Sequence, residues 1–242
     1  IEVCLVGSEM CIRDRFTEID GTFPNHHPNP VDPETLELLR AEVAAASADL
    51  GIGFDGDGDR IGVIDSTGRQ VPGDLLTAFL AKDVAARHPG APILLDVKSS
   101  EAALRLVESA GAAAQIWKTG HSHMKKRMKE LEAPLAGEMS GHIFIADNYL
   151  GFDDAIYAAV RVITQMVKGG QSITEFMDSL PEQHATPELR IDCPDTVKFD
   201  SMEKIRAHVL SRHDAADVNS IDGVRVPVSY THLTLPTKED GG

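Results

Sequence analysis

Short apolar runs alternate with helical segments through the middle of the chain, and this alternation constrains the fold more than any other feature. The strands that we expect there are 92–97, 114–118 and 142–146, and the helices are 75–86, 101–110, 123–131, 153–167 and 173–180. Strands that alternate with helices predict helices packed on a largely parallel or mixed sheet. We therefore expect an α/β fold built on mixed sheets.

The segments on either side of this region follow different patterns. Residues 21–33 contain four prolines and form a loop, after which Asp32 and Pro33 begin a helix that ends near Ser47. Strands 49–54 and 61–65 then flank a loop rich in Asp and Gly. After Pro181 we expect a strand at 188–193, a helix at 202–211 and a strand at 220–226, and this change of pattern marks a domain boundary.

The two ends fit no obvious element and resemble translated sequencing adapters. We therefore expect residues 1–15 to be a non-native leader and residues 228–242 a non-native tail. Cys4 and Cys11 lie in the expected leader. Cys193 then remains alone, which permits no internal disulfide and is typical of a reducing cytoplasm.

Composition excludes two broad classes of function. The chain has 242 residues, with 23 Lys and Arg against 38 Asp and Glu, and a formal net charge of −15. Such acidity repels the phosphate backbone of nucleic acids. No apolar run approaches the roughly 20 residues that a membrane-spanning helix needs. A phosphorylated ligand would therefore need a local basic pocket or a metal ion.

The segment 55–60, Asp-Gly-Asp-Gly-Asp-Arg, lies between two expected strands and gives the strongest chemical signal. Alternation places Asp55, Asp57 and Asp59 on one side of a tight loop, where three carboxylates need a cation. An EF-hand requires Gly at its sixth position and Glu at its twelfth, where this chain has Arg60 and Ser66. A Mg²⁺ site fits the loop better than a calcium sensor, and a solvated acidic turn is the simpler alternative.

Residues 51–56 also satisfy the dinucleotide-binding pattern Gly-x-Gly-x-x-Gly. That pattern must open a helix whose N-terminus holds a pyrophosphate. Here it leads into aspartates and a second strand, so we reject this reading.

A second motif, Gly-Glu-Met-Ser-Gly-His, spans residues 137–142. It places Glu138, Ser140 and His142 at alternate positions, where a carboxylate, a hydroxyl and an imidazole suit the hydroxyl groups of a sugar. Alone, such a motif is more often only a turn. Lys98 and His121 each follow the carboxyl end of an expected strand, the edge at which α/β sheets bind ligands. The basic helix that carries Lys125 is by default a solvated face.

Together these motifs resemble the α-D-phosphohexomutase superfamily, and most closely its bacterial phosphomannomutase/phosphoglucomutase branch. The resemblance covers roughly residues 16–226. The segments that carry it are 21–30, 55–60, 118–122, 137–142, 151–154 and 220–225.

The resemblance implies an isomerase of four domains that interconverts hexose 1-phosphates and 6-phosphates, with mannose or glucose as the sugar. In such enzymes a phosphoserine forms a bisphosphate intermediate, and Mg²⁺ holds the phosphoryl oxygens. The residues that match the metal ligands are Asp55, Asp57 and Asp59. Those that match the sugar-recognition loop are Glu138, Ser140 and His142. Those that match catalytic or phosphate-contacting positions are Arg60, Lys98 and His121.

The chain also departs from the pattern of this family. The segment with the catalytic serine, and the phosphate loop that should follow Arg225, have no match here. We therefore expect the end of domain II (16–69), domain III (70–181) and the start of domain IV (182–227), with the missing domains of the same enzyme as partners. Such a fragment should be inactive alone. A non-catalytic module that binds Mg²⁺ or sugar phosphates, and less so an Asp-based phosphatase, remain as alternatives.

Overall fold

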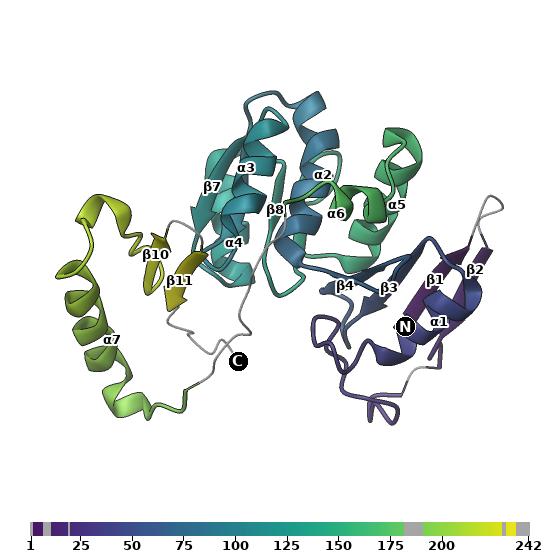
Figure 1. The fold of residues 1–242 in the computed structure, drawn as a ribbon, viewed down its shortest axis with the longest axis horizontal. Coiled ribbons are helices and arrows are strands. Elements are labelled where there is room, and N and C mark those ends of the chain that lie inside the picture. The colour runs from purple at the N-terminus through teal and green to yellow at the C-terminus, as the bar shows by residue number, and fades with distance from the viewer. Residues whose placement is uncertain (1, 7–10, 19, 182–190, 229–230, 236–242) are drawn as a thin grey trace.

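The computed structural model describes residues 2–6, 11–18, 20–181, 191–228 and 231–235. Figure 1 shows three parts along the chain: a sheet with helix α1, a second sheet flanked by helices, and a C-terminal part with helix α7. Among the helices of the described ranges, none combines the length and apolarity needed to cross a lipid bilayer.

The first part is an antiparallel sheet of five strands in the order β2-β1-β3-β4-β5. Its strands are β1 (Glu2–Val6), β2 (Cys11–Arg15), β3 (Leu50–Phe54), β4 (Ile61–Asp65) and β5 (Gln70–Val71). Helix α1 (Glu37–Ala46) buries Leu39 and Val43. This helix begins four residues later than an N-cap at Asp32 predicts. Tight turns come first, in which Thr35 and Leu36 donate their N–H groups to the carbonyls of Asp32 and Pro33.

The expectation that residues 1–15 form no element is wrong. Strand β1 pairs with β3 and with β2, in both cases antiparallel. The segment Glu-Val-Cys-Leu-Val is rich in strand-favouring residues, and β3 has an edge whose backbone groups need partners. Residues 2–6 supply those partners, so the backbone pairing with β3 determines the register of β1.

The second part is a mixed sheet of four strands in the order β7-β6-β8-β9. Its strands are β6 (Pro92–Asp96), β7 (Ala113–Trp117), β8 (Leu135–Gly137) and β9 (Ile143–Ile145), of which only β9 runs antiparallel. Its helices are α2 (Gly73–Arg87), α3 (Glu101–Ser109), α4 (His121–Leu131), α5 (Ala155–Gly169) and α6 (Ile173–Asp178). The α/β fold with mixed sheets is thereby confirmed.

The C-terminal part consists of α7 (Asp195–Leu210), a short 3-10 turn (Ala215–Asp217), and strands β10 (Val224–Val228) and β11 (Thr231–Leu235). The expected helix is present but starts earlier than residue 202. The expected strand 188–193 lies largely outside the described residues, and its described end at 191–193 is not a strand. Strand β11 pairs with β10, so the expected tail contains an element. Cys193 is exposed and free.

One hydrophobic core connects the two sheets. The largest cluster of buried side chains joins Ile52 and Val63 of the first sheet to Phe79 of α2, Ile93 of β6 and Val162 of α5. Each of these five side chains is at most 1% exposed. Burial of this kind contributes about 25 cal/mol per Å² of apolar surface. The core therefore holds β3, β4 and the loop between them against the second sheet.

Candidate functional site

The segment 55–60 is a tight loop between β3 and β4, and its backbone is organised by Asp55. Oδ1 of Asp55 accepts the N–H groups of Gly58, Asp59 and Arg60 at 3.0–3.1 Å. Its Oδ2 accepts Nε of Arg60 at 2.6 Å. Burial opposes ionisation of Asp55, but the bonds from Arg60 outweigh it and lower the pKa of this carboxyl. Asp55 therefore fixes the shape of the loop through both of its carboxylate oxygens.

The three carboxylates predicted to bind metal lie together. One oxygen from each of Asp55, Asp57 and Asp59 falls within a group that spans at most 4.8 Å. Burial, followed by a hydrogen bond with Asp55 and the nearby charges, raises the pKa of Asp59 to about 6, although the charge of His142 opposes this rise. The loop is therefore short of positive charge. An all-oxygen donor set with this deficit fits Mg²⁺.

The motif at 137–142 also brings its polar side chains together. Oγ of Ser140 lies 3.1 Å from Oε2 of Glu138 and 2.8 Å from Nδ1 of His142. Glu138 is almost fully buried, and its Oε1 accepts the N–H of Gly120 at 2.7 Å. Burial disfavours the charged imidazole, yet the hydrogen bond to Glu138 and the surrounding carboxylates raise the pKa of His142.

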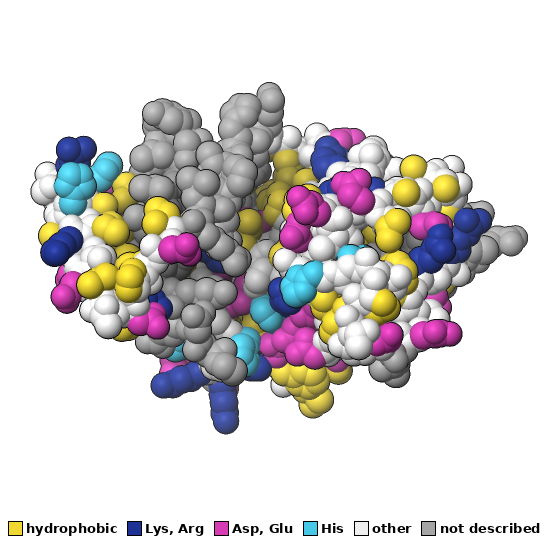
Figure 2. Space-filling view, turned by 90° about the horizontal axis from the view of Figure 1, so that it is seen from below, with side chains coloured by type: hydrophobic (Ala, Val, Ile, Leu, Met, Phe, Trp, Pro, Cys, Tyr) yellow, Lys and Arg dark blue, Asp and Glu magenta, His cyan; other side chains and the backbone are white. Residues whose placement is uncertain are grey.

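The predicted metal loop (residues 55–60, also called the Asp loop) and the predicted sugar loop (residues 137–142) are joined through their backbones. Ile61 donates its N–H to the carbonyl of Gly141 at 3.0 Å, and Arg60 pairs with His142 in an isolated antiparallel bridge. Gly141 has φ +92°, and a Cβ there would lie 2.5 Å from the carbonyl oxygen of Ile61. Nε2 of His142 consequently lies 3.4 Å from Oδ2 of Asp59. Figure 2 shows acidic and histidine side chains gathered near the middle of one face.

The three predicted catalytic residues occupy different places around this junction. Arg60 is tied to Asp55 and also donates to Oδ1 of Asn29 at 3.2 Å, from the proline-rich loop. His121 begins α4, and its ring lies 6.4 Å from the ring of His142. Lys98 follows β6 and is half-buried, and its charge acts on Asp96. The structure therefore places His121 beside the sugar loop and Lys98 at the end of the neighbouring strand.

Two carboxylates at the site were not predicted from the sequence. Asp153 accepts Nζ of Lys125 at 2.9 Å and lies 3.9 Å from Nδ1 of His121. Lys125 is therefore paired, which corrects the expectation of a solvated basic face. Asp96 is fully buried at the end of β6, and burial raises its pKa to about 7. The motif at 151–154 was a signal for Asp153, whereas nothing in the sequence separates Asp96 from an ordinary strand residue.

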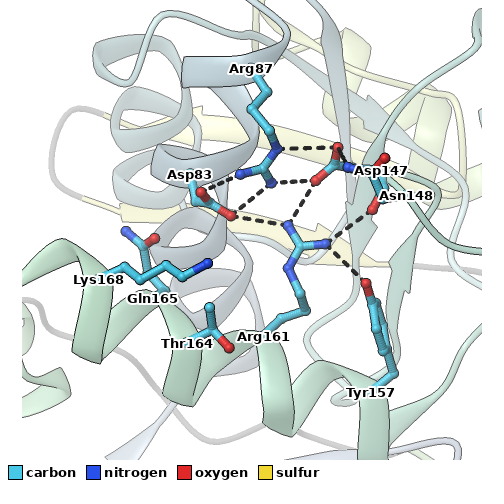
Figure 3. Close-up of a pocket in the computed structure, with 9 residues that line it drawn as sticks. All are labelled: Asp83, Arg87, Asp147, Asn148, Tyr157, Arg161, Thr164, Gln165 and Lys168. Atoms are coloured by element: carbon cyan, nitrogen blue, oxygen red, sulfur yellow. Dashed lines mark hydrogen bonds and ion pairs between the residues drawn. The ribbon is translucent and has the colours of Figure 1, made fainter.

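A pocket of about 240 Å³ lies elsewhere, between α2, α5 and the loop after β9 (Figure 3). Arg87 and Arg161 both pair with Asp83 and Asp147 across it. These opposite charges neutralise one another. We therefore interpret the four side chains as a link between α2 and α5 rather than as a second catalytic centre.

Two parts of the chain match sequence models of one protein family. Residues 6–68 match the family model described as phosphoglucomutase/phosphomannomutase, alpha/beta/alpha domain II. Residues 72–184 match the model for alpha/beta/alpha domain III of the same family.

Individual relatives agree with these matches. The chain is 46% identical over 211 residues to a phosphomannomutase/phosphoglucomutase of Pseudomonas putida, which covers 87% of this chain and 45% of that protein. It is 38% identical over 221 residues to a phosphoglucomutase of Neisseria gonorrhoeae, with coverage of 91% and 47%. It matches a crystal structure of a phosphoglucomutase/phosphomannomutase family protein from Burkholderia thailandensis with a TM-score of 0.80 and 40% identity, covering 89% of this chain and 45% of that one.

The chain thus spans a little under half the length of the relatives that it matches. The two family models together cover strands β2, β3 and β4 of the first sheet, all four strands of the second sheet, and the two loops that meet between the sheets. The chain belongs to the phosphoglucomutase/phosphomannomutase family and contains domains II and III of that family.

Proposed function

We propose that this chain supplies the metal-binding and sugar-binding loops of an enzyme that interconverts hexose 1-phosphates and 6-phosphates. The observation that supports this most strongly is the contact between Asp59 and His142. Because the Asp loop and the sugar loop share backbone hydrogen bonds, a phosphoryl group near the first lies beside the sugar held by the second. The family relatives, named as mutases for mannose and glucose phosphates, support the substrate class.

In this proposal Asp55, Asp57 and Asp59 hold Mg²⁺. The ion, when bound, neutralises charge on phosphoryl oxygens. Asp57 is the exposed member of the three, open to solvent and ligand, whereas Asp55 also fixes the loop through its bonds to backbone N–H groups. The half-buried Asp59 carries the raised pKa, so it releases its proton when a cation binds at mildly acidic pH.

The residues of the second sheet bind the sugar phosphate. Glu138 accepts hydrogen bonds from ring hydroxyls, Ser140 donates to them or accepts from them, and His142 provides a ring N–H donor between the sugar and the metal loop. His121 holds or transfers a proton near a hydroxyl. Lys98 and Arg60 offer positive charge to phosphate oxygens.

We further propose that residues 16–69 are the C-terminal part of domain II, residues 70–181 are domain III, and residues 182–227 are the start of domain IV. The phosphoserine is then supplied by the remaining domains of the same enzyme. The chain alone is expected to bind ligands without turning them over. Mutase activity of the 242-residue chain would contradict this expectation.

The metal site is tested by titrating Mg²⁺ into the chain by isothermal calorimetry. Asp57→Asn should weaken Mg²⁺ binding by roughly tenfold or more. The substitution removes one metal-coordinating carboxylate and leaves the hydrogen bonds of Asp55 intact. Glu108→Gln, at an exposed acidic position in α3 outside the Asp loop, is the matched control and should leave Mg²⁺ binding unchanged. Equal affinities for wild type and Asp57→Asn would contradict the metal site.

The sugar site is tested separately by NMR titration with α-D-glucose 1-phosphate and α-D-mannose 1-phosphate. Glu138→Gln keeps the shape of the side chain but removes its charge. This variant should weaken binding of whichever sugar phosphate the wild type accepts, because a buried acceptor of hydroxyl hydrogen bonds becomes neutral. Unchanged affinity for both ligands would remove Glu138 from the sugar site.

A further inference from the structure

The segment 219–226 lies far along the chain from the second sheet, yet its side chains reach the edge of that sheet. Arg225 is 3% exposed. Its Nη1 donates to the carbonyl oxygens of Val97 at 2.8 Å and Ser99 at 2.6 Å, and its Nη2 donates to Oε1 of Glu101 at 2.8 Å. Lys98 lies between the two carbonyls, so one guanidinium fixes the backbone on both sides of this residue.

Asp222 makes the corresponding contact on the neighbouring loop. It is 9% exposed, and its Oδ2 accepts the N–H of Thr119 at 3.0 Å. The next N–H along the chain, that of Gly120, is accepted by Glu138. These are backbone donors at the start of α4, which the helix itself cannot satisfy. Since His121 is the first residue of α4, the two carboxylates set the direction in which this histidine leaves the loop.

The two side chains belong to one short turn. Asn219 and Arg225 exchange backbone hydrogen bonds of 2.8 and 2.9 Å, and Oδ1 of Asn219 accepts the N–H of Ile221 at 2.9 Å. The turn therefore presents Asp222 and Arg225 at a fixed spacing. It contacts the loop after β6 with one side chain and the loop after β7 with the other.

We propose that Arg225 and Asp222 are positioning residues that set Lys98 and His121 for the sugar phosphate. This inference rests on the proposed function of the site. A guanidinium is planar and holds its N–H groups in a rigid fork, so it fixes two carbonyl groups at once. Lysine carries the same charge but no fork, and it can replace only part of this contact.

The test compares variants of the full 242-residue chain. We would measure the dissociation constant for α-D-glucose 1-phosphate, in saturating Mg²⁺, by NMR. Arg225→Met should weaken binding roughly tenfold or more, since small misplacements of ligand-contacting groups have large effects. Arg225→Lys should recover part of the loss. Arg212→Met, at an exposed arginine 13 residues earlier in the sequence, is the control and should stay within about twofold of wild type.

Amide hydrogen exchange in the same samples separates positioning from simple destabilisation. Arg225→Met should speed exchange at residues 97–101, and Asp222→Ala at residues 119–121, while protection in α2 and α5 stays at the wild-type level. If Arg225→Met does not fold, the Asp222→Ala variant alone tests the positioning role.

The outcomes distinguish this inference from the proposed function. Wild-type chain that fails to bind the sugar phosphate contradicts the proposed function, and the positioning role with it. If wild type binds α-D-glucose 1-phosphate and both Arg225→Met and Asp222→Ala bind it equally well, the positioning role alone is overturned. Weaker binding that accompanies loss of protection throughout α2 and α5 assigns both residues to general stability and also overturns it.

Discussion

Replacing Asp147 with Asn should destabilise the fold more than any change to the exposed charges around it. The Asp147 side chain is 1% exposed and lies between α2 and α5 (Figure 3). It accepts hydrogen bonds from Arg161 at 2.8 Å, from His88 at 2.9 Å and from Arg87. Asn has the same shape but no charge, and its NH₂ group would face side chains that themselves donate to Asp147.

The size of the effect follows from the exposure of the partners. Removing one partner of a buried ion pair costs about 3–5 kcal/mol. The Arg161 side chain is only 11% exposed, but Arg87 at 38% and His88 at 44% are partly solvated, so we expect about 3 kcal/mol, at the lower end of that range. In a chain of this length each kcal/mol shifts the Tm by roughly 2–4 °C, so the Tm should fall by about 6–12 °C.

The matched control is Asp83→Asn. Asp83 contacts the same two arginines, but its side chain is 30% exposed, so its loss should cost about 1 kcal/mol. Thermal unfolding followed by circular dichroism measures both variants. Roughly 2 °C is the smallest shift in Tm expected for 1 kcal/mol in a chain of this length. A Tm for Asp147→Asn that lies within about 2 °C of wild type, or above that of Asp83→Asn, would therefore refute the reasoning. Either result would mean that the buried charge stabilises the fold no more than an exposed one.

The same carboxylate predicts a pH dependence. Burial opposes its ionisation, but the bonds from Arg87, His88 and Arg161 lower the pKa of Asp147 well below its ordinary value. A group whose pKa is lower in the folded state stabilises the fold above its unfolded pKa of about 3.9, and this contribution is lost as the pH falls below that value. The Tm difference between wild type and Asp147→Asn should therefore be full at pH 7 and shrink towards pH 3.

Two further predictions concern the sugar loop. Gly137→Ala should cost about 2–3 kcal/mol in urea unfolding, because its Cβ would lie 1.8 Å from Oγ1 of Thr77 in α2, whereas Gly21→Ala, with nothing within 4 Å, should be neutral. Asp59→Asn should lower the pKa of His142, since the charge of Asp59 is one of those that raise it; an unchanged titration of the imidazole in NMR spectra would contradict the contact between the two loops.

Sequence patterns predicted the central elements because burial there follows secondary structure. Residues 93–95 of β6 form an apolar run that is buried on both faces, and α5 has the periodicity of a helix with one buried side. Local chemistry also identified the Asp loop, because three carboxylates within five residues are close in any turn that they form. These features depend on neighbours in the sequence.

The remaining features depend on contacts between distant segments. Asp59 and His142 are 83 residues apart in the sequence. They lie close together because Ile61 donates its backbone N–H to the carbonyl of Gly141. Arg225 is read from the sequence as an ordinary strand residue, and its role appears only when β10 lies beside the loop after β6. Strand β1 was missed for the same reason, since its partner β3 begins 44 residues after β1 ends.

The way in which the two loops are joined constrains how a ligand can turn within the site. The Asp loop and the sugar loop are linked by backbone hydrogen bonds, and both sheets share one core, so neither loop can move without breaking buried contacts. If the function proposed above holds, a bisphosphate that presents first one phosphoryl group and then the other has to reorient against a fixed surface. Lys98 lies in the loop after β6 and His121 directly follows the loop after β7, and the turn at 219–225 contacts these two loops through Arg225 and Asp222. Any adjustment of the site to the two orientations is then expected to come from that turn, while the metal and sugar loops keep their geometry.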